Sequence, residues 1–97
     1  MKREGDFQTK LIHEIKDRFE GVIVLKNDPN YIQGIPDLLV LYKDKWAALE
    51  CKRSKDAKKQ PNQDYYVGYL GEMSYASFVY PENKEEVLDE LQQTFRA

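Results

Sequence analysis

The chain has 97 residues, which is room for one small domain with a single core. Hydrophobic residues make up 41% of it and charged residues 33%, and no apolar run approaches the roughly 20 residues of a membrane span. The 15 basic and 17 acidic residues give a net charge of −2, which taken alone argues against nucleic-acid binding. We therefore expect one soluble domain, 1–97, with no membrane partner.

The cysteine content and the N-terminus indicate where the protein works. The single cysteine, Cys51, excludes an internal disulfide, and no Cys/His cluster suggests structural zinc. The first residues include a basic pair but no apolar run behind it, so they do not form a signal peptide. We expect a cytoplasmic protein.

The hydrophobic pattern predicts seven elements in the order helix, three strands, helix, strand, helix. Their predicted ranges are a helix at 6–20, strands at 22–26, 37–43 and 46–52, a helix at 63–70, a strand at 75–80 and a helix at 81–95. Asp44 and Lys45 separate the second and third strands and predict a tight hairpin turn. This order indicates an α/β fold with a four-stranded mixed sheet, whose last strand arrives by a right-handed crossover.

Charge is unevenly distributed along the chain. The segment 43–59 has seven basic and three acidic residues, whereas 82–97 has five acidic and two basic residues. The near-neutral total therefore hides a basic middle and an acidic C-terminal helix.

Three charged residues on the predicted hairpin are candidates for chemistry. Side chains alternate along a strand, so Glu50 and Lys52 share one face. Asp37 opens the preceding strand, where Asp is disfavoured. A hairpin centred on the 44–45 turn pairs residues whose numbers sum to 89, which places Asp37 opposite Lys52 and diagonal to Glu50. Such a cluster suits a hard divalent cation, whereas the alternative is a solvated strand end and a turn residue after Pro36.

The first helix offers a further carboxylate. Glu4 and Gln8 lie in the direction of the apolar stripe, so Glu4 is the preferred active-site acid and Glu14, at the margin, is the reserve. A frayed, solvated terminus is the alternative for Glu4. His13 falls on the polar face of the helix, which argues against His-based nucleophilic catalysis.

A basic segment follows Glu50 and Lys52 directly. It contains Arg53, Lys55, Lys58 and Lys59, with Gln60, Asn62 and Gln63 interleaved. Next to a metal site it is placed to hold a phosphate backbone, although a solvated loop is the simpler interpretation. Tyrosines 65, 66 and 69 follow, and we expect core or rim packing, with stacking on bases or a partner subunit as the alternative.

Together these residues resemble the PD-(D/E)xK nuclease superfamily. The motif is Pro36-Asp37 followed thirteen positions later by Glu50-Cys51-Lys52, each on a predicted strand. The chain is most similar to the small stand-alone VRR-NUC proteins of phages and bacteria, which are related to Holliday-junction resolvases. The matching features are Glu4-x-x-x-Gln8, Gly34-Ile-Pro-Asp-Leu, Leu49-Glu-Cys-Lys and Gln63-x-x-Tyr66, in matching element order from about 4 to 91.

The resemblance implies a restriction-endonuclease-like core and a site for Mg²⁺ or Mn²⁺. Asp37, Glu50 and the main-chain carbonyl of Cys51 would bind the metal, with Glu4 completing the acidic set. Lys52 would orient the attacking water and stabilise negative charge, and Gln63 would brace the site or touch the scissile phosphate. DNA contacts would come from Arg53, Lys55, Lys58, Lys59 and Gln8.

The activity implied is metal-dependent hydrolysis of DNA phosphodiester bonds, selective for branched structures such as Holliday junctions. The resemblance also implies a homodimer with no organic cofactor, located in the host cytoplasm if the protein is phage-encoded. One alternative is a catalytically silent nuclease fold that binds DNA or a partner protein. Another is a small subunit that a nuclease complex recruits through the acidic C-terminal helix.

Overall fold

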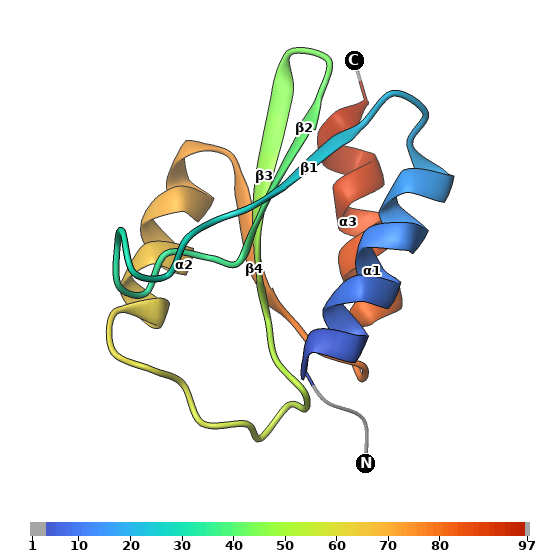
Figure 1. The fold of residues 1–97 in the computed structure, drawn as a ribbon. Helices are drawn as coiled ribbons and strands as arrows, with labels where there is room; N and C mark the ends of the chain where they lie inside the picture. The colour runs from blue at the N-terminus through green and yellow to red at the C-terminus, as the bar shows by residue number, and fades with distance from the viewer. Residues whose placement is uncertain (1–3, 97) are drawn as a thin grey trace.

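A four-stranded sheet with helices on both faces forms the core of the molecule, here in a computed structural model (Figure 1). The structure describes residues 4–96, and only the main chain of Glu4. Its elements, in chain order, are α1 (Glu4–Arg18), β1 (Ile23–Lys26), β2 (Leu38–Tyr42), β3 (Lys45–Cys51), α2 (Gln63–Met73), β4 (Tyr75–Val79) and α3 (Lys84–Phe95). The α/β class and the predicted order of elements are confirmed.

The strands lie in the order β1-β2-β3-β4, so each strand neighbours the next one along the chain. The pairs β1–β2 and β2–β3 are antiparallel, whereas β3 and β4 are parallel and joined through α2. A parallel pair needs a crossover connection, and the basic segment and α2 provide it. The predicted mixed sheet is therefore confirmed.

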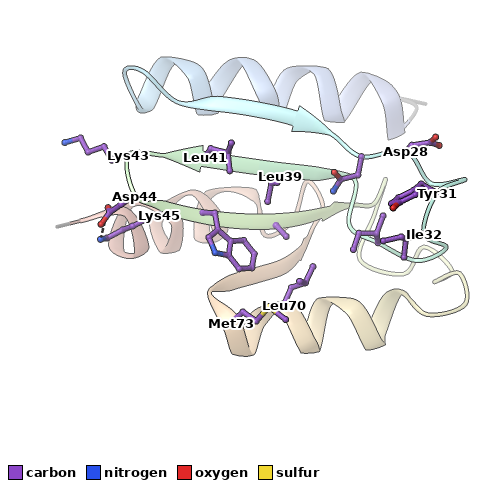
Figure 2. A pocket seen from close by; sticks show the side chains of 14 residues that line it. Asp28, Tyr31, Ile32, Leu39, Leu41, Lys43, Asp44, Lys45, Leu70 and Met73 are labelled. Atoms are coloured by element: carbon purple, nitrogen blue, oxygen red, sulfur yellow. Dashed lines mark hydrogen bonds and ion pairs between the residues drawn. The ribbon is translucent and has the colours of Figure 1, made fainter.

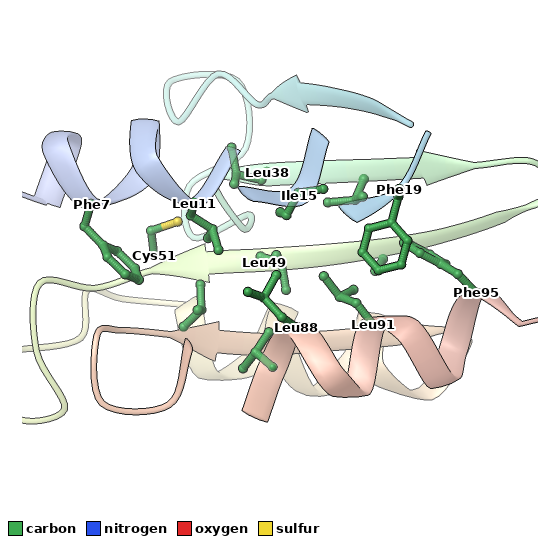
Figure 3. Close-up of a cluster of buried hydrophobic side chains, with 14 residues drawn as sticks. Phe7, Leu11, Ile15, Phe19, Leu38, Leu49, Cys51, Leu88, Leu91 and Phe95 are labelled. Carbon is green, nitrogen blue, oxygen red and sulfur yellow. The ribbon is translucent and has the colours of Figure 1, made fainter. Parts of the chain in front are cut away.

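One face of the sheet is covered by α1 and α3 and holds the hydrophobic core (Figure 3). The two helices contribute apolar stripes at helical spacing, and the strands contribute alternate residues, among them Leu38, Val40, Ala47, Leu49 and Cys51. The predicted inward residues of the last helix, namely Val87, Leu88, Leu91 and Phe95, are all buried.

The other face is covered only in part. The α2 helix packs over β3 and β4, and none of its residues is buried. Within residues 4–96, no helix has the length and apolar character needed to cross a lipid bilayer.

The turn between β2 and β3 corrects the predicted register. Tyr42 pairs with Lys45, so the two turn residues are Lys43 and Asp44 rather than Asp44 and Lys45. Lys43 adopts a left-handed conformation with φ of 57°, which lets the chain reverse one residue earlier. Moving the turn centre by one residue moves the pairing by two, and Leu38 consequently pairs with Leu49. The expectation that Asp37 lies opposite Lys52 is therefore wrong.

A close approach at Gly34 connects the loop before β2 to the start of α2. Gly34 has φ of 90°, and a Cβ atom there would lie 2.6 Å from Cβ of Asn62 and 2.8 Å from the carbonyl oxygen of Pro61. Only glycine combines this conformation with this contact. The loop thereby fixes the turn from which α2 begins.

We predict that Gly34→Ala lowers the free energy of unfolding by about 1–3 kcal/mol, because it adds strain and a clash. Gly68→Ala is the matched control, since nothing lies within 4 Å of a Cβ atom at that helical position. It should stabilise the protein by about 0.5–1 kcal/mol. Urea unfolding followed by circular dichroism measures both changes, and equal effects would contradict the close approach.

Candidate active site

Asp37 lies just before the start of β2, and Glu50 lies near the end of β3 on the neighbouring strand. Leu38 pairs with Leu49, and the next pair outward in this register is Asp37 and Glu50. The main-chain N–H of Cys51 donates a hydrogen bond of 2.9 Å to Oδ2 of Asp37. Asp37 is therefore fixed across the end of the hairpin, directly beside Glu50 rather than diagonal to it.

Alternation along the strands sets which face carries these groups. Leu38, Leu49 and Cys51 point into the core beneath α1 and α3, so Asp37 and Glu50 lie on the α2 face of the sheet. The same alternation places Lys52, the first residue after β3, on this face. The prediction that Glu50 and Lys52 share a face opposite Cys51 agrees with this arrangement.

Glu50 is held by the first residue of α2. Its side chain is 2% exposed, and Nε2 of Gln63 donates a 3.0 Å hydrogen bond to Oε2 of Glu50. Oε1 of Gln63 accepts a 2.9 Å hydrogen bond from the main-chain N–H of Gln60. Gln63 is thus oriented from both ends of its amide, and it sets the direction of the Glu50 carboxylate.

Lys52 is a buried lysine with a main-chain partner for its ammonium group. It is 6% exposed, and Nζ donates to the carbonyl oxygen of Lys58 at 3.2 Å. Its own main-chain N–H donates to the carbonyl of Val79 at 2.8 Å. Burying an ammonium group is costly without such contacts. The contact with Lys58 also draws the basic segment over the end of β3.

The basic segment connects Lys52 to Gln63, so both of its ends lie at the site. Arg53, Lys55, Lys58 and Lys59 are all exposed. Lys59 forms an ion pair and a cation–π contact, because its Nζ lies 3.0 Å from Oδ1 of Asp64 and 4.4 Å from the centre of the Phe78 ring. Arg53 follows Lys52 directly and the carbonyl of Lys58 accepts from Lys52, so these two exposed cations lie near the site.

The two candidate active-site acids of α1, Glu4 and Glu14, lie far apart along the helix. Glu4 begins the helix at the end of the sheet where β3 finishes (Figure 1), and its side chain lies outside the described residues. Gln8 is half-buried, one turn further along. Glu14 lies about 15 Å along the helix from Glu4, and it forms a 3.0 Å ion pair with Lys84 of α3. Glu14 therefore belongs to the contact between two helices, and His13 is exposed as predicted.

The donor chemistry suits a hard divalent cation. Asp37 and Glu50 supply carboxylate oxygens side by side, and the Cys51 main chain lies next to them. Among the side chains described from residue 5 to 96, no group of three or more His, Cys, Asp or Glu residues is placed to hold a metal. The remaining ligands in such a site would be the Cys51 carbonyl and water, together with Glu4.

Two hydrogen bonds at the site cannot be predicted from the sequence. The Lys58 carbonyl that binds Lys52 and the Gln60 N–H that binds Gln63 are main-chain groups of an irregular segment. A hydrophobic pattern does not predict such contacts, because any residue type provides them.

No protein-family model matches this sequence, and no curated protein matches it either.

A new carboxylate at position 63 tests the contact with Glu50. We predict that Gln63→Glu lowers the free energy of unfolding by about 1–3 kcal/mol at pH 7, because two carboxylates then face each other. Gln60→Glu, at an exposed side chain, is the control and should leave the stability unchanged. Denaturant midpoints at pH 7 distinguish the two variants.

Proposed function

We propose that this chain is a divalent-metal-dependent DNA endonuclease that hydrolyses phosphodiester bonds. The observation that carries the proposal is that Asp37 and Glu50 occupy facing positions in the β2–β3 register, with the buried Lys52 on the same face and the basic segment beginning directly after it. Selectivity for branched DNA and a homodimeric state are part of the proposal and rest on the resemblance.

In this proposal Asp37, Glu50 and the carbonyl of Cys51 would hold Mg²⁺ or Mn²⁺, with Glu4 as a further ligand. When bound, the cation offsets charge on the phosphate oxygens and lowers the pKa of a water molecule. Gln63 keeps the Glu50 carboxylate turned toward the site through the hydrogen bond at Oε2. The hydrogen bond from Cys51 keeps the Asp37 carboxylate in the same place.

In this proposal Lys52 stabilises the negative charge that develops during hydrolysis. Its ammonium group is held at the carbonyl of Lys58 and keeps further N–H donors for water or a phosphate oxygen. In a site that excludes bulk water, a fixed positive charge stabilises the negative charge that develops as a phosphodiester is attacked. The expected contribution of such a group is about 10²–10³ in kcat.

The basic segment would provide the surface that binds the DNA backbone. Arg53, Lys55 and Lys58 are exposed on the segment that follows Lys52, and their charges would offset those of neighbouring phosphates. The net charge of −2 does not oppose this role, because five of the acids lie in 82–97. Binding of this kind weakens steeply as the salt concentration rises.

Cleavage assays test the proposal directly. We predict that the purified chain cuts a four-way junction or other branched DNA in Mg²⁺ or Mn²⁺ and is inactive in EDTA. Lys52→Ala and Asp37→Asn should each lower kcat by at least about a hundredfold. Lys16→Ala and Asp17→Asn, on the exposed face of α1, are matched controls and should cut like the wild type.

Two results would contradict the nuclease proposal. One is a folded wild-type protein that cuts neither branched nor linear DNA with either metal, and the other is normal cutting by both site variants. Binding of DNA without cutting would support the alternative, a catalytically silent DNA-binding module.

The basic segment is tested separately from the chemistry. We predict that Lys58→Ala weakens DNA binding and lowers the slope of log K against log salt by about one. The variant should keep its kcat, because Lys52 contacts the main-chain carbonyl of Lys58 and not its side chain. Lys59→Ala should change the slope less, since Lys59 is paired with Asp64. Fluorescence anisotropy at several salt concentrations measures both slopes, and equal slopes for all three proteins would exclude this surface as the DNA contact.

A further inference from the structure

The candidate active site continues along the sheet into an open apolar cavity. On the α2 face, the β2–β3 register lines up three successive pairs of residues, which are Asp37 with Glu50, Leu39 with Ala48, and Leu41 with Trp46. Successive residues on one face of a strand are about 7 Å apart. The second and third pairs form the floor of a cavity of about 740 Å³ between the sheet, the loop before β2 and α2 (Figure 2). The cavity therefore begins one side-chain step from the two carboxylates.

Hydrogen bonds within the chain hold both walls of the cavity. On the loop side, Asn27 donates from its main-chain N–H to the carbonyl oxygen of Asp37 and from Nδ2 to the carbonyl oxygen of Pro36, each at 2.8 Å. On the other side, the hydroxyl group of Ser74 donates to the carbonyl oxygen of Trp46 and fixes the end of α2 against β3. The cavity is thus pre-formed, and its loop wall is attached directly to a residue that carries one of the two carboxylates.

The lining of the cavity is apolar in the middle and charged at the ends. Leu70 and Met73 of α2 lie along one side of the strand pairs. Figure 2 shows the charged lining residues, which are Asp28 at the loop end and Lys43, Asp44 and Lys45 at the hairpin end. This arrangement suits a flat apolar group whose neighbours in the same molecule are charged.

We propose that the cavity holds the bases of unpaired nucleotides next to the scissile phosphodiester bond. The inference rests on the proposed function, because the strand would reach the cavity from the candidate metal site. Every base has a flat π-face that stacks well on an aromatic side chain. The indole of Trp46, half-buried in the floor, is placed for this contact. In a duplex the bases are paired and stacked on one another, so a base enters the cavity only when it is unpaired.

The position of the charges supports a nucleotide chain as the occupant. If one phosphate lies at the Asp37 and Glu50 carboxylates through a bound cation, the next bases along the strand lie over the floor of the cavity. Lys43 and Lys45, at the far end, carry positive charges for a further phosphate. Nζ of Lys45 lies 3.5 Å from Oδ1 of Asp44, and an exposed pair of this kind is weak enough for a phosphate to replace.

The inference refines the class of substrate. A four-way junction in which every base is paired presents no free base to the cavity. Among branched DNAs, we therefore expect the chain to prefer those with unpaired nucleotides beside the cut, such as a single-stranded overhang. This preference would come from the apolar floor and not from the basic segment, since phosphate contacts are common to all DNA.

The fluorescence of Trp46 tests the inference without any cleavage, because this residue is the single tryptophan of the chain. In EDTA at low salt, an oligothymidylate of about eight nucleotides should quench the emission of the full chain as its bases stack on the indole. A blunt, fully paired duplex should give an apparent Kd that is at least about tenfold higher.

Two variants place a carboxylate at exposed positions of the lining. Met73→Glu and Tyr31→Glu should each raise the Kd for the single strand at least about fivefold, because the carboxylate repels phosphates and makes the lining polar. Thr9→Glu adds the same charge at an exposed position of α1, which covers the opposite face, and should bind like the wild type. Circular dichroism confirms that each variant is folded.

Equal Kd values for the two DNAs, or no quenching by the single strand, would overturn the inference. Normal binding by both lining variants would overturn it as well. A chain that is quenched by the single strand but cuts no DNA supports a base-binding cavity while contradicting the proposed function. A chain that cuts DNA but is not quenched does the reverse.

Discussion

The hydrogen bond from the main chain of Cys51 to the carboxylate of Asp37 connects the start of β2 to the end of β3. The other residues of the candidate site depend on this connection. It forms only in the register set by the turn at Lys43 and Asp44. A slip of one residue would turn Glu50 into the core and Leu49 out of it, since side chains alternate between faces. The apolar packing of Leu49 therefore also holds the two carboxylates on the same face.

The two faces of the sheet have different tasks. The α1–α3 face contains the buried apolar residues and supplies most of the stability, because α1 and α3 bury the alternate apolar residues of the central strands. The α2 face carries the polar site where α2 begins and, where α2 ends, an open cavity of about 740 Å³ that Leu70 and Met73 help to line. One short helix thus contributes Gln63 to the first and Met73 to the second. Changes in how α2 sits on the sheet affect both.

The order of the elements, the core residues of α3 and the shared face of Asp37, Glu50 and Lys52 follow from sequence periodicity. They are predictable because the periods of 3.6 and 2 act over many residues. The hairpin register differs by two residues from the one that the sequence predicts. The turn depends on the left-handed conformation of Lys43, and neither Asn nor Gly marks that position.

Other features needed the three-dimensional arrangement. The contact of Lys52 with the Lys58 carbonyl depends on the path of an irregular segment. The cavity between α2 and the sheet depends on how much of the sheet an eleven-residue helix leaves uncovered, which no local pattern specifies. The sequence predicts core or rim packing for Tyr65 and Tyr69, yet both side chains are exposed. Their spacing was visible in the sequence, but the side they face was not.

The location of a bound metal ion tests the central proposal most directly. A crystal of the full chain grown with Mn²⁺ allows the ion to be found by its anomalous scattering. The nuclease proposal predicts a peak between the carboxylates of Asp37 and Glu50, bound also by the carbonyl of Cys51. A crystal saturated with Mn²⁺ that has no peak between these two carboxylates would contradict it.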